Sequence, residues 1–165
     1  SYKQVAVDQT SDKVRQIDLA KYAREIVNSL TPKIKKTNHT ITINCPESIH
    51  AYCHAGAISQ ILTNLIVNSL THGLENNDNG EIIIEIARQN NTIHILYSDN
   101  GVGVSAQQLD QLFDPFYTTK STKGGTGLGT HIIHSLVQDT LNGTIVASSP
   151  EGQGLHYDIA FDNMQ

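Results

Sequence analysis

Apolar residues in this chain recur with two different periods, which separate helical segments from strands. A spacing of three or four residues predicts an amphipathic helix over residues 19–30, at Leu19, Tyr22, Ala23, Ile26, Val27 and Leu30. Asp18 is its expected N-cap, and Pro32 predicts a break soon after it. The same spacing predicts a longer, largely buried helix over residues 54–73, closed by Gly73, at Ile58, Ile61, Leu62, Leu65, Ile66 and Leu70.

Alternating or short apolar runs predict strands elsewhere in the chain. These are residues 14–17, "HTITINC", the two halves of "EIIIEIARQNNTIHILYSD" joined at "QNN", "GTIVASS" and "GLHYDIAF". "SAQQLDQLFD" and "LGTHIIHSLVQDTL" predict two more helices, and "HAYCH" is interpreted as strand-end and turn packing. This order predicts an α+β fold, a two-layer α/β sandwich whose mixed, mostly antiparallel sheet has helices on one face.

The length of 165 residues favours a single domain. We place it at residues 13–161, with residues 1–12 as a linker or tail and 162–165 as a short tail. The chain begins at Ser1 rather than methionine, so we expect it to be a piece of a longer protein.

Charge and composition exclude several partners. The formal net charge of -5, with 11 basic residues and no basic cluster, argues against nucleic acid. No run is apolar enough to span a membrane, so we expect no direct membrane contact by this domain. The two cysteines fit a reducing, cytoplasmic setting, and neither "HAYCH" nor "ENNDNGE" has the ligand spacing of a zinc or calcium site.

The glycine cluster "GGTGLGT", residues 124–130, enters a predicted helix as a phosphate-binding loop would. It lacks the lysine of a P-loop, and the dinucleotide fingerprint would need glycine at Thr130. Backbone N–H groups at a helix start can bind an anion whatever the motif, but a flexible loop before a core helix explains the cluster equally well.

Three other stretches carry candidate chemistry. Asn64 and Asn68 lie one helical turn apart, and Thr71 and His72 follow them. Inside a helix, asparagine lowers the stability of the helix by up to about 0.7 kcal/mol relative to alanine. "YSDNGVGV" ends a strand with Asp99 before two glycines, and "FDPFYTTK" is a stiff aromatic loop. Each stretch alone also fits solvated amides, an ordinary turn or a packed loop.

Taken together and in this order, the four stretches resemble the ATP-binding catalytic domain of sensor histidine kinases, in the group that includes gyrase-type and Hsp90-type ATPases. "QILTNLIVNSLTHG" resembles the N box, "DNGVG" the first glycine box, "FDPFYTTK" the F box and "GGTGLGTHIIHSLV" the second glycine box. The resemblance covers roughly residues 13–161. It implies the Bergerat ATP-binding fold, with ATP between the N-box helix and a lid over about 104–126.

The resemblance also implies roles for single residues. Asp99 would accept a hydrogen bond from the adenine amino group, beside Gly101 and Gly103, and Asn68 would bind Mg²⁺ through its amide oxygen. Asn64 and His72 would line the ribose and phosphate side. The remaining implied nucleotide contacts are Thr118, Gly125, Thr126, Gly127, Leu128 and Gly129, with Lys120 or Lys123 supplying charge in the lid.

One position separates branches of the group. ATPase and serine-kinase members have an acidic residue where this chain has Asn64, and an amide cannot act as a general base. A histidine acceptor needs no such base, so the resemblance implies transfer of the γ-phosphoryl group to histidine. None of the eight histidines lies in an acceptor motif, so the acceptor is expected on a dimerisation domain outside this chain, in a homodimer, with a response regulator as the next partner.

Three departures from the family pattern keep alternatives open. Thr71 stands where a phosphate-contacting lysine is frequent, Val67 where an acidic residue is frequent, and Leu155 where a threonine near adenine is usual. One alternative is a nucleotide-binding regulatory module without phosphoryl transfer. The other is an anti-sigma-type serine kinase or ATPase, which Asn64 disfavours. Whether the parent protein is anchored in a membrane is left open.

Overall fold

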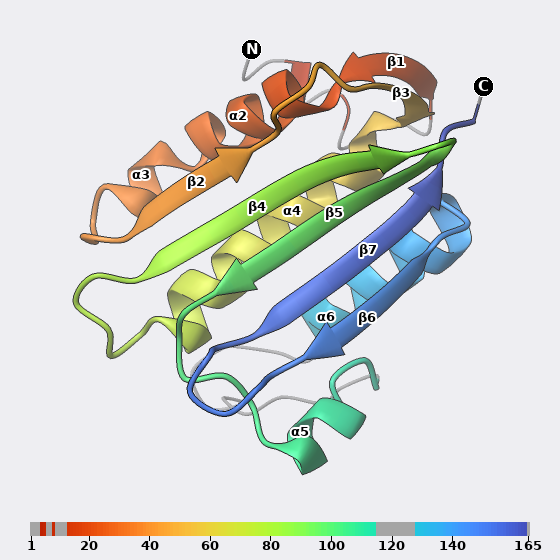
Figure 1. Cartoon of the computed structure of the whole chain (residues 1–165). Coiled ribbons are helices and arrows are strands. Elements are labelled where there is room, and N and C mark those ends of the chain that lie inside the picture. The colour runs from red at the N-terminus through yellow and green to blue at the C-terminus, as the bar shows by residue number, and fades with distance from the viewer. Residues whose placement is uncertain (1–3, 6–7, 9–12, 115–127, 165) are drawn as a thin grey trace.

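The fold is a sheet covered by helices on one face, as the sequence predicts (Figure 1). The computed structural model describes residues 4–5, 8, 13–114 and 128–164. Its strands are β1 (Val14–Asp18), β2 (Thr40–Asn44), β3 (His50–His54), β4 (Glu81–Gln89), β5 (Thr92–Asp99), β6 (Thr144–Ser148) and β7 (His156–Asp162). Its helices are α2 (Leu19–Ser29), α3 (Thr31–Ile34), α4 (Ala55–Asn68), α5 (Ala106–Asp110) and α6 (Leu128–Ser135), with π-helical turns η1 (Ser69–Gly73) and η3 (Leu136–Thr140).

The main sheet has the strand order β2-β4-β5-β7-β6. The β2–β4 pair is parallel and the other three pairs are antiparallel, which confirms the predicted mixed sheet. In the β4–β5 pair, Ile84 lies opposite Tyr97 and Ile82 opposite Asp99. The carboxylate of Asp99 therefore lies where β5 ends.

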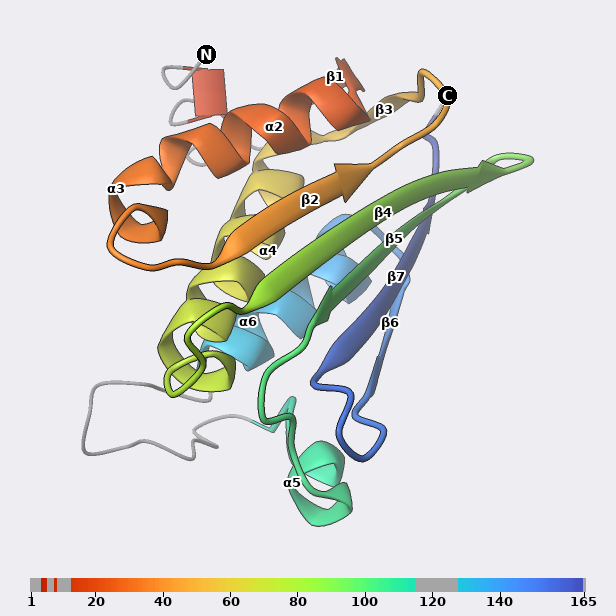
Figure 2. The ribbon, with the colours of Figure 1, turned by 60° about the vertical axis from the view of Figure 1, so that its left-hand side comes forward.

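The alternation of buried and exposed residues along the strands explains which face of the sheet the helices cover. Ile82, Ile84 and Ile86 of β4 are buried, whereas Glu85 between them is exposed. The buried positions meet α2, α4 and α6, which lie in one layer behind the sheet (Figure 2). Full burial of each large aliphatic side chain stabilises the fold by about 1.5–3 kcal/mol, so this inner face holds the two layers together.

Helix boundaries follow local chemistry at three places. The Asp18 carboxylate accepts a hydrogen bond from the backbone N–H of Lys21 at 3.1 Å, which confirms the predicted N-cap of α2. α2 ends at Ser29, and Pro32 lies in the first turn of the separate helix α3, as the predicted break requires. The long helix predicted over 54–73 is α-helical only to Asn68, because its last turn is the π-helical η1.

The interpretation of "HAYCH" as strand-end and turn packing is wrong, because the whole segment is strand β3. It pairs antiparallel with β1 in a separate two-stranded sheet, with Cys53 opposite Arg15. Five residues with a histidine at each end gave no clear period, so only the pairing with β1 defines the strand.

Two residues near the start of the chain, Val5 and Asp8, pack on the domain. Val5 is 3% exposed and belongs to the core, and the buried Asp8 carboxylate accepts hydrogen bonds from the guanidinium of Arg15 and the hydroxyl of Tyr22, at 2.6 and 2.7 Å. Arg15 lies over the ring of Tyr22, 5.4 Å from its centroid. Within the described ranges, no helix is long and apolar enough to cross a membrane.

Candidate functional site

The Asp99 carboxylate is the most highly organised predicted site residue. It is 5% exposed at the end of β5. Its Oδ1 accepts hydrogen bonds from the backbone N–H groups of Gly101 and Leu155, at 3.0 and 3.3 Å. Its Oδ2 accepts one from the hydroxyl of Ser69, at 2.7 Å. A buried carboxylate needs such donors, and these come from η1, from the loop after β5 and from the loop before β7.

Glycines let three backbone segments converge on this carboxylate. A Cβ on Gly73 would lie 2.9 Å from Oδ2 of Asp99, and one on Gly154 would overlap the carbonyl oxygen of Asp99. Gly154 also has a positive φ of 76°, which a residue with a side chain rarely adopts. A Cβ on Gly101 would overlap the Gly73 carbonyl, so this predicted glycine permits contact with η1.

Asn64 and Asn68 are both half-buried on α4, one helical turn apart as predicted. Among the described residues, no hydrogen bond is made by the Asn68 side chain. The predicted polar stripe changes at η1, where the wider π-helical turn leaves Thr71 exposed and His72 half-buried. The Asn68 amide oxygen is a hard donor with its lone pairs available, which is what a hard cation such as Mg²⁺ needs.

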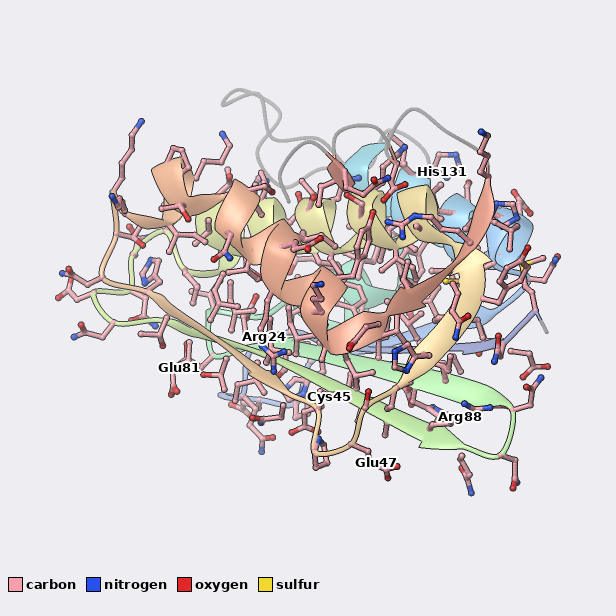
Figure 3. All side chains as sticks on the ribbon, turned by 90° about the horizontal axis from the view of Figure 1, so that it is seen from above. Arg24, Cys45, Glu47, Glu81, Arg88 and His131 are labelled. Carbon is pink, nitrogen blue, oxygen red and sulfur yellow. The ribbon has the colours of Figure 1, made fainter. Side chains whose placement is uncertain are left out.

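The start of α6 meets α4 at Asn68. A Cβ on Gly129 would lie 3.5 Å from both Oδ1 and Nδ2 of the Asn68 amide. The next residue, Thr130, is 7% exposed and donates its hydroxyl to the carbonyl of Leu112 at 2.6 Å. His131, on the helix side of the molecule, has its Nδ1 3.4 Å from the carbonyl of Phe113 (Figure 3).

The structure therefore brings together only part of the predicted set. Asn68 lies beside Gly129, while Asp99 lies beside Gly101, and Ser69, the residue after Asn68, bonds to Asp99. Leu128 is the first residue of α6. Gly103 has a φ of 68° and faces Ser149 and Gly154 in the loop between β6 and β7. The predicted contacts outside the described residues are Thr118, Lys120, Lys123, Gly125, Thr126 and Gly127.

A pocket of about 410 Å³ lies next to this region. It is lined by Gly73, Asn76, Asn77, Asp78, Asn79, Asn100, Gly101 and Val102. Gly101 is its one predicted site residue, and Asp99 and Asn68 do not line it. The site is accordingly defined by those two side chains. In the parts of the chain that the structure describes, no group of three or more His, Cys, Asp or Glu residues could hold a metal ion.

Sequence reasoning missed Ser69, Tyr97, Gly73 and Gly154 as neighbours of Asp99. The "GQG" of the turn before β7 was a usable signal for Gly154, because paired glycines in a hairpin often mark a close backbone approach. The sequence contains no such signal for Ser69 and Tyr97, because each lies among apolar residues at a position where a core residue is expected. Their role depends on the packing of η1 against β5.

Comparison with known proteins identifies the family. Residues 53–164 match the family described as histidine kinase-, DNA gyrase B-, and HSP90-like ATPase. Over 133 residues the chain is 33% identical to the sensor protein DegM of Bacillus sp. (strain B21-2), covering 80% of this chain and 34% of DegM. It is 30% identical over 158 residues to the sensor protein kinase WalK of Staphylococcus epidermidis (strain ATCC 35984), covering 90% of this chain and 25% of WalK. The chain thus spans about a third or less of these relatives.

Solved structures identify the fold. The catalytic domain of histidine kinase ThkA superposes with a TM-score of 0.80 at 23% identity, covering 92% of this chain and 96% of that domain. ThkA in complex with the response regulator protein TrrA superposes with a TM-score of 0.76 at 21% identity, covering 92% of this chain and 42% of ThkA. The predicted Bergerat fold is confirmed. The chain belongs to the family of histidine kinase-, DNA gyrase B- and HSP90-like ATPases.

Proposed function

We propose that this chain is the ATP-binding catalytic domain of a sensor histidine kinase, and that it transfers the γ-phosphoryl group of ATP to a histidine on a dimerisation domain. The proposal is supported by two neighbouring residues at the end of α4, which connect two chemical sites. Asn68 lies beside the start of α6, and the adjacent Ser69 bonds to the buried Asp99. Asp99 can therefore bind the base and Asn68 the triphosphate of one nucleotide, with a fixed distance between the two residues.

At the base end, Asp99 accepts a hydrogen bond from the adenine amino group. Two backbone N–H groups and one hydroxyl already hold the carboxylate, so it is oriented before the nucleotide arrives. Oriented groups lose little freedom on binding, which improves affinity. The lack of a side chain at Gly73 and Gly101 lets η1 and the loop after β5 pack closely around Asp99.

At the phosphate end, the backbone N–H groups at the start of α6 point their partial positive charge toward the phosphates. Asn68 is the residue that would hold Mg²⁺, and its half-buried amide beside Gly129 fits that role. When bound, the ion would supply positive charge that offsets the negative charge of the phosphates. Lys120 or Lys123, with Thr118, Gly125, Thr126 and Gly127, complete the phosphate contacts in this proposal.

The transfer step needs placement more than acid–base chemistry. A histidine nitrogen of the dimerisation domain forms a bond to the γ-phosphorus while the bond from that phosphorus to the bridging oxygen breaks, and ADP leaves. Asn64 cannot take a proton from water, so hydrolysis by the isolated domain is slow. The dimerisation domain belongs to a homodimer, and a response regulator then accepts the phosphoryl group, as the ThkA–TrrA complex suggests. We place the domain in the cytoplasm, where ATP is available.

The test uses labelled ATP, this chain and a separately made dimerisation domain of the parent protein. Acid-labile, alkali-stable phosphate on a histidine of that domain is the expected product, and Asn68→Ala should abolish it. Stable phosphoserine, or rapid ATP turnover without transfer, would contradict the proposal in favour of a serine kinase or ATPase. Nucleotide binding without any transfer would support the regulatory module instead.

A further inference from the structure

A chain of buried hydroxyl groups connects helix α4 with the Asp99 carboxylate. The hydroxyl of Tyr97 donates to the carbonyl of Leu65 at 2.9 Å and lies 2.7 Å from the hydroxyl oxygen of Ser69. Ser69 donates its own hydrogen to Oδ2 of Asp99 at 2.7 Å. The single hydrogen of Tyr97 is therefore shared between Leu65 and Ser69. Ser69 and Tyr97 are 4% and 1% exposed, so no solvent contact explains their polarity.

The presence of hydroxyl groups at these two buried positions requires an explanation, because apolar side chains could fill the same space. Ser69 follows a largely buried helix, and Tyr97 lies with Ile95 on the buried inner face of β5. A buried hydroxyl that loses its partner costs about 1–3 kcal/mol. The hydrogen of Ser69 goes to the carboxylate of Asp99, although the Tyr97 hydroxyl oxygen, also 2.7 Å away, could accept it as well. The chain therefore serves the orientation of that carboxylate.

We propose that Ser69 and Tyr97 are positioning residues that hold Asp99 for a 6-amino purine and so set the base preference of the site. This inference rests on the proposed ATP-binding function. A carboxylate held by donors on both oxygens presents only lone pairs to a bound base. An amino group at position 6 donates to those lone pairs, whereas a 6-oxo group opposes them with its own. Without Ser69, Oδ2 is no longer held, and the carboxylate can turn away from the base.

The selective readout is the ratio of the affinities for Mg-ATP and Mg-ITP, because inosine differs from adenosine in carrying a 6-oxo in place of the 6-amino group. Titration calorimetry on the whole chain measures both. Ser69→Ala should weaken ATP binding by about tenfold and leave ITP binding unchanged, on the scale of a hydrogen bond to a charged group. Tyr97→Phe should weaken ATP binding by about threefold in the same selective way, since Ser69 keeps its bond to Asp99.

The chain offers matched controls whose hydroxyls are not among those that connect α4 with Asp99. Tyr22→Phe removes a buried tyrosine hydroxyl that donates to Asp8, and Ser59→Ala removes another fully buried serine hydroxyl from α4. Neither should change the ATP to ITP ratio, although both can lower stability. If Ser69→Ala does not fold by circular dichroism, Tyr97→Phe, which conserves volume, decides the question.

The outcomes separate this inference from the function on which it rests. A selective loss of ATP affinity in both variants supports the positioning role. Equal losses for ATP and ITP, or no loss for either, would overturn it while the proposed function stands. Failure of the unaltered chain to bind ATP at all would overturn the proposed function as well.

Discussion

Asp99 accepts three hydrogen bonds from the protein, and asparagine at this position would set an amide NH₂ group against those donors. Asp99→Asn should weaken ATP binding by about 1–3 kcal/mol, the range for a hydrogen bond to a charged group. Titration calorimetry with Mg-ATP measures the change. Asp139→Asn, at an exposed carboxylate of η3, is the control and should bind normally. Unchanged affinity in Asp99→Asn would remove Asp99 from the site.

The two cysteines should differ in reactivity. Burial raises the pKa of the Cys53 thiol to about 12, and the side chain is fully buried in β3. Cys45 is half-buried near Arg24 just after β2, and burial raises the pKa of its thiol as well (Figure 3). Because the thiolate is the reactive form, iodoacetamide should label Cys45 first and Cys53 only after unfolding. Mass spectrometry of the labelled peptides checks this, and equal labelling of both in the folded protein would contradict it.

The sequence predicts single site residues as far as local patterns express them. Asp99 ends a strand shortly before Gly101, and Asn68 interrupts an apolar helix, so the sequence could indicate both as site residues. Ser69 and Tyr97 could not, because serine within an apolar run and tyrosine at a buried strand position look like core packing. Only the approach of η1 to β5 places the Ser69 hydroxyl on the carboxylate and the Tyr97 hydroxyl beside Ser69.

At the scale of elements, the contact between α6 and the segment after α5 is the part of the site most open to a test. Thr130→Val keeps the side-chain shape but leaves the Leu112 carbonyl without its buried donor. We expect unfolding free energy to fall by about 1–3 kcal/mol, and affinity to fall more for Mg-ATP than for adenosine. The difference arises because Gly129, next to Thr130, lies at the phosphate end.

Urea unfolding and calorimetry with both ligands measure these two effects. Thr130→Ser keeps the donor and should restore both values toward those of the unaltered chain. Equal losses of affinity for ATP and adenosine would show that Thr130 acts on stability alone.

Element type was predictable from the two periods, and the order of elements led to the correct architecture. The π-helical turn η1 was not, because its apolar positions continue the spacing of α4 without a visible break. What defines it is the hydrogen bond from the backbone N–H of Leu74 to the carbonyl of Ser69, five residues back. The second sheet, β1 with β3, was missed since such short strands are defined by their partner.

At the scale of the whole molecule, Asp8 joins the start of the chain to the domain. Burial raises the pKa of this carboxyl group, but hydrogen bonds from Arg15, Tyr22 and Gln4 together outweigh it and lower the pKa below its usual value. A lowered pKa stabilises the folded state above the unfolded value of about 3.9, and this stabilisation is lost as the pH falls through the folded value. Acidic pH should therefore weaken the contacts of Asp8 with Arg15 and Tyr22.

Asp8→Asn should lower the free energy of unfolding by about 1–3 kcal/mol at pH 7, because Arg15 and Tyr22 lose a charged partner. The difference from the unaltered chain should shrink at pH 3, where the carboxyl group begins to take up a proton. Urea unfolding at the two pH values measures it. A difference that grows on acidification would contradict the account of this junction.

We propose that this domain binds ATP through Asn68 and Mg²⁺ at one end and Asp99 at the other. Calorimetric titration of the chain with ATP, with Mg²⁺ and with excess chelator, tests it most directly. We expect saturable binding that weakens at least tenfold without Mg²⁺, and an Asn68→Ala variant that binds weakly whether or not Mg²⁺ is present. Binding that is indifferent to Mg²⁺ and to Asn68, or no binding at all, would contradict it.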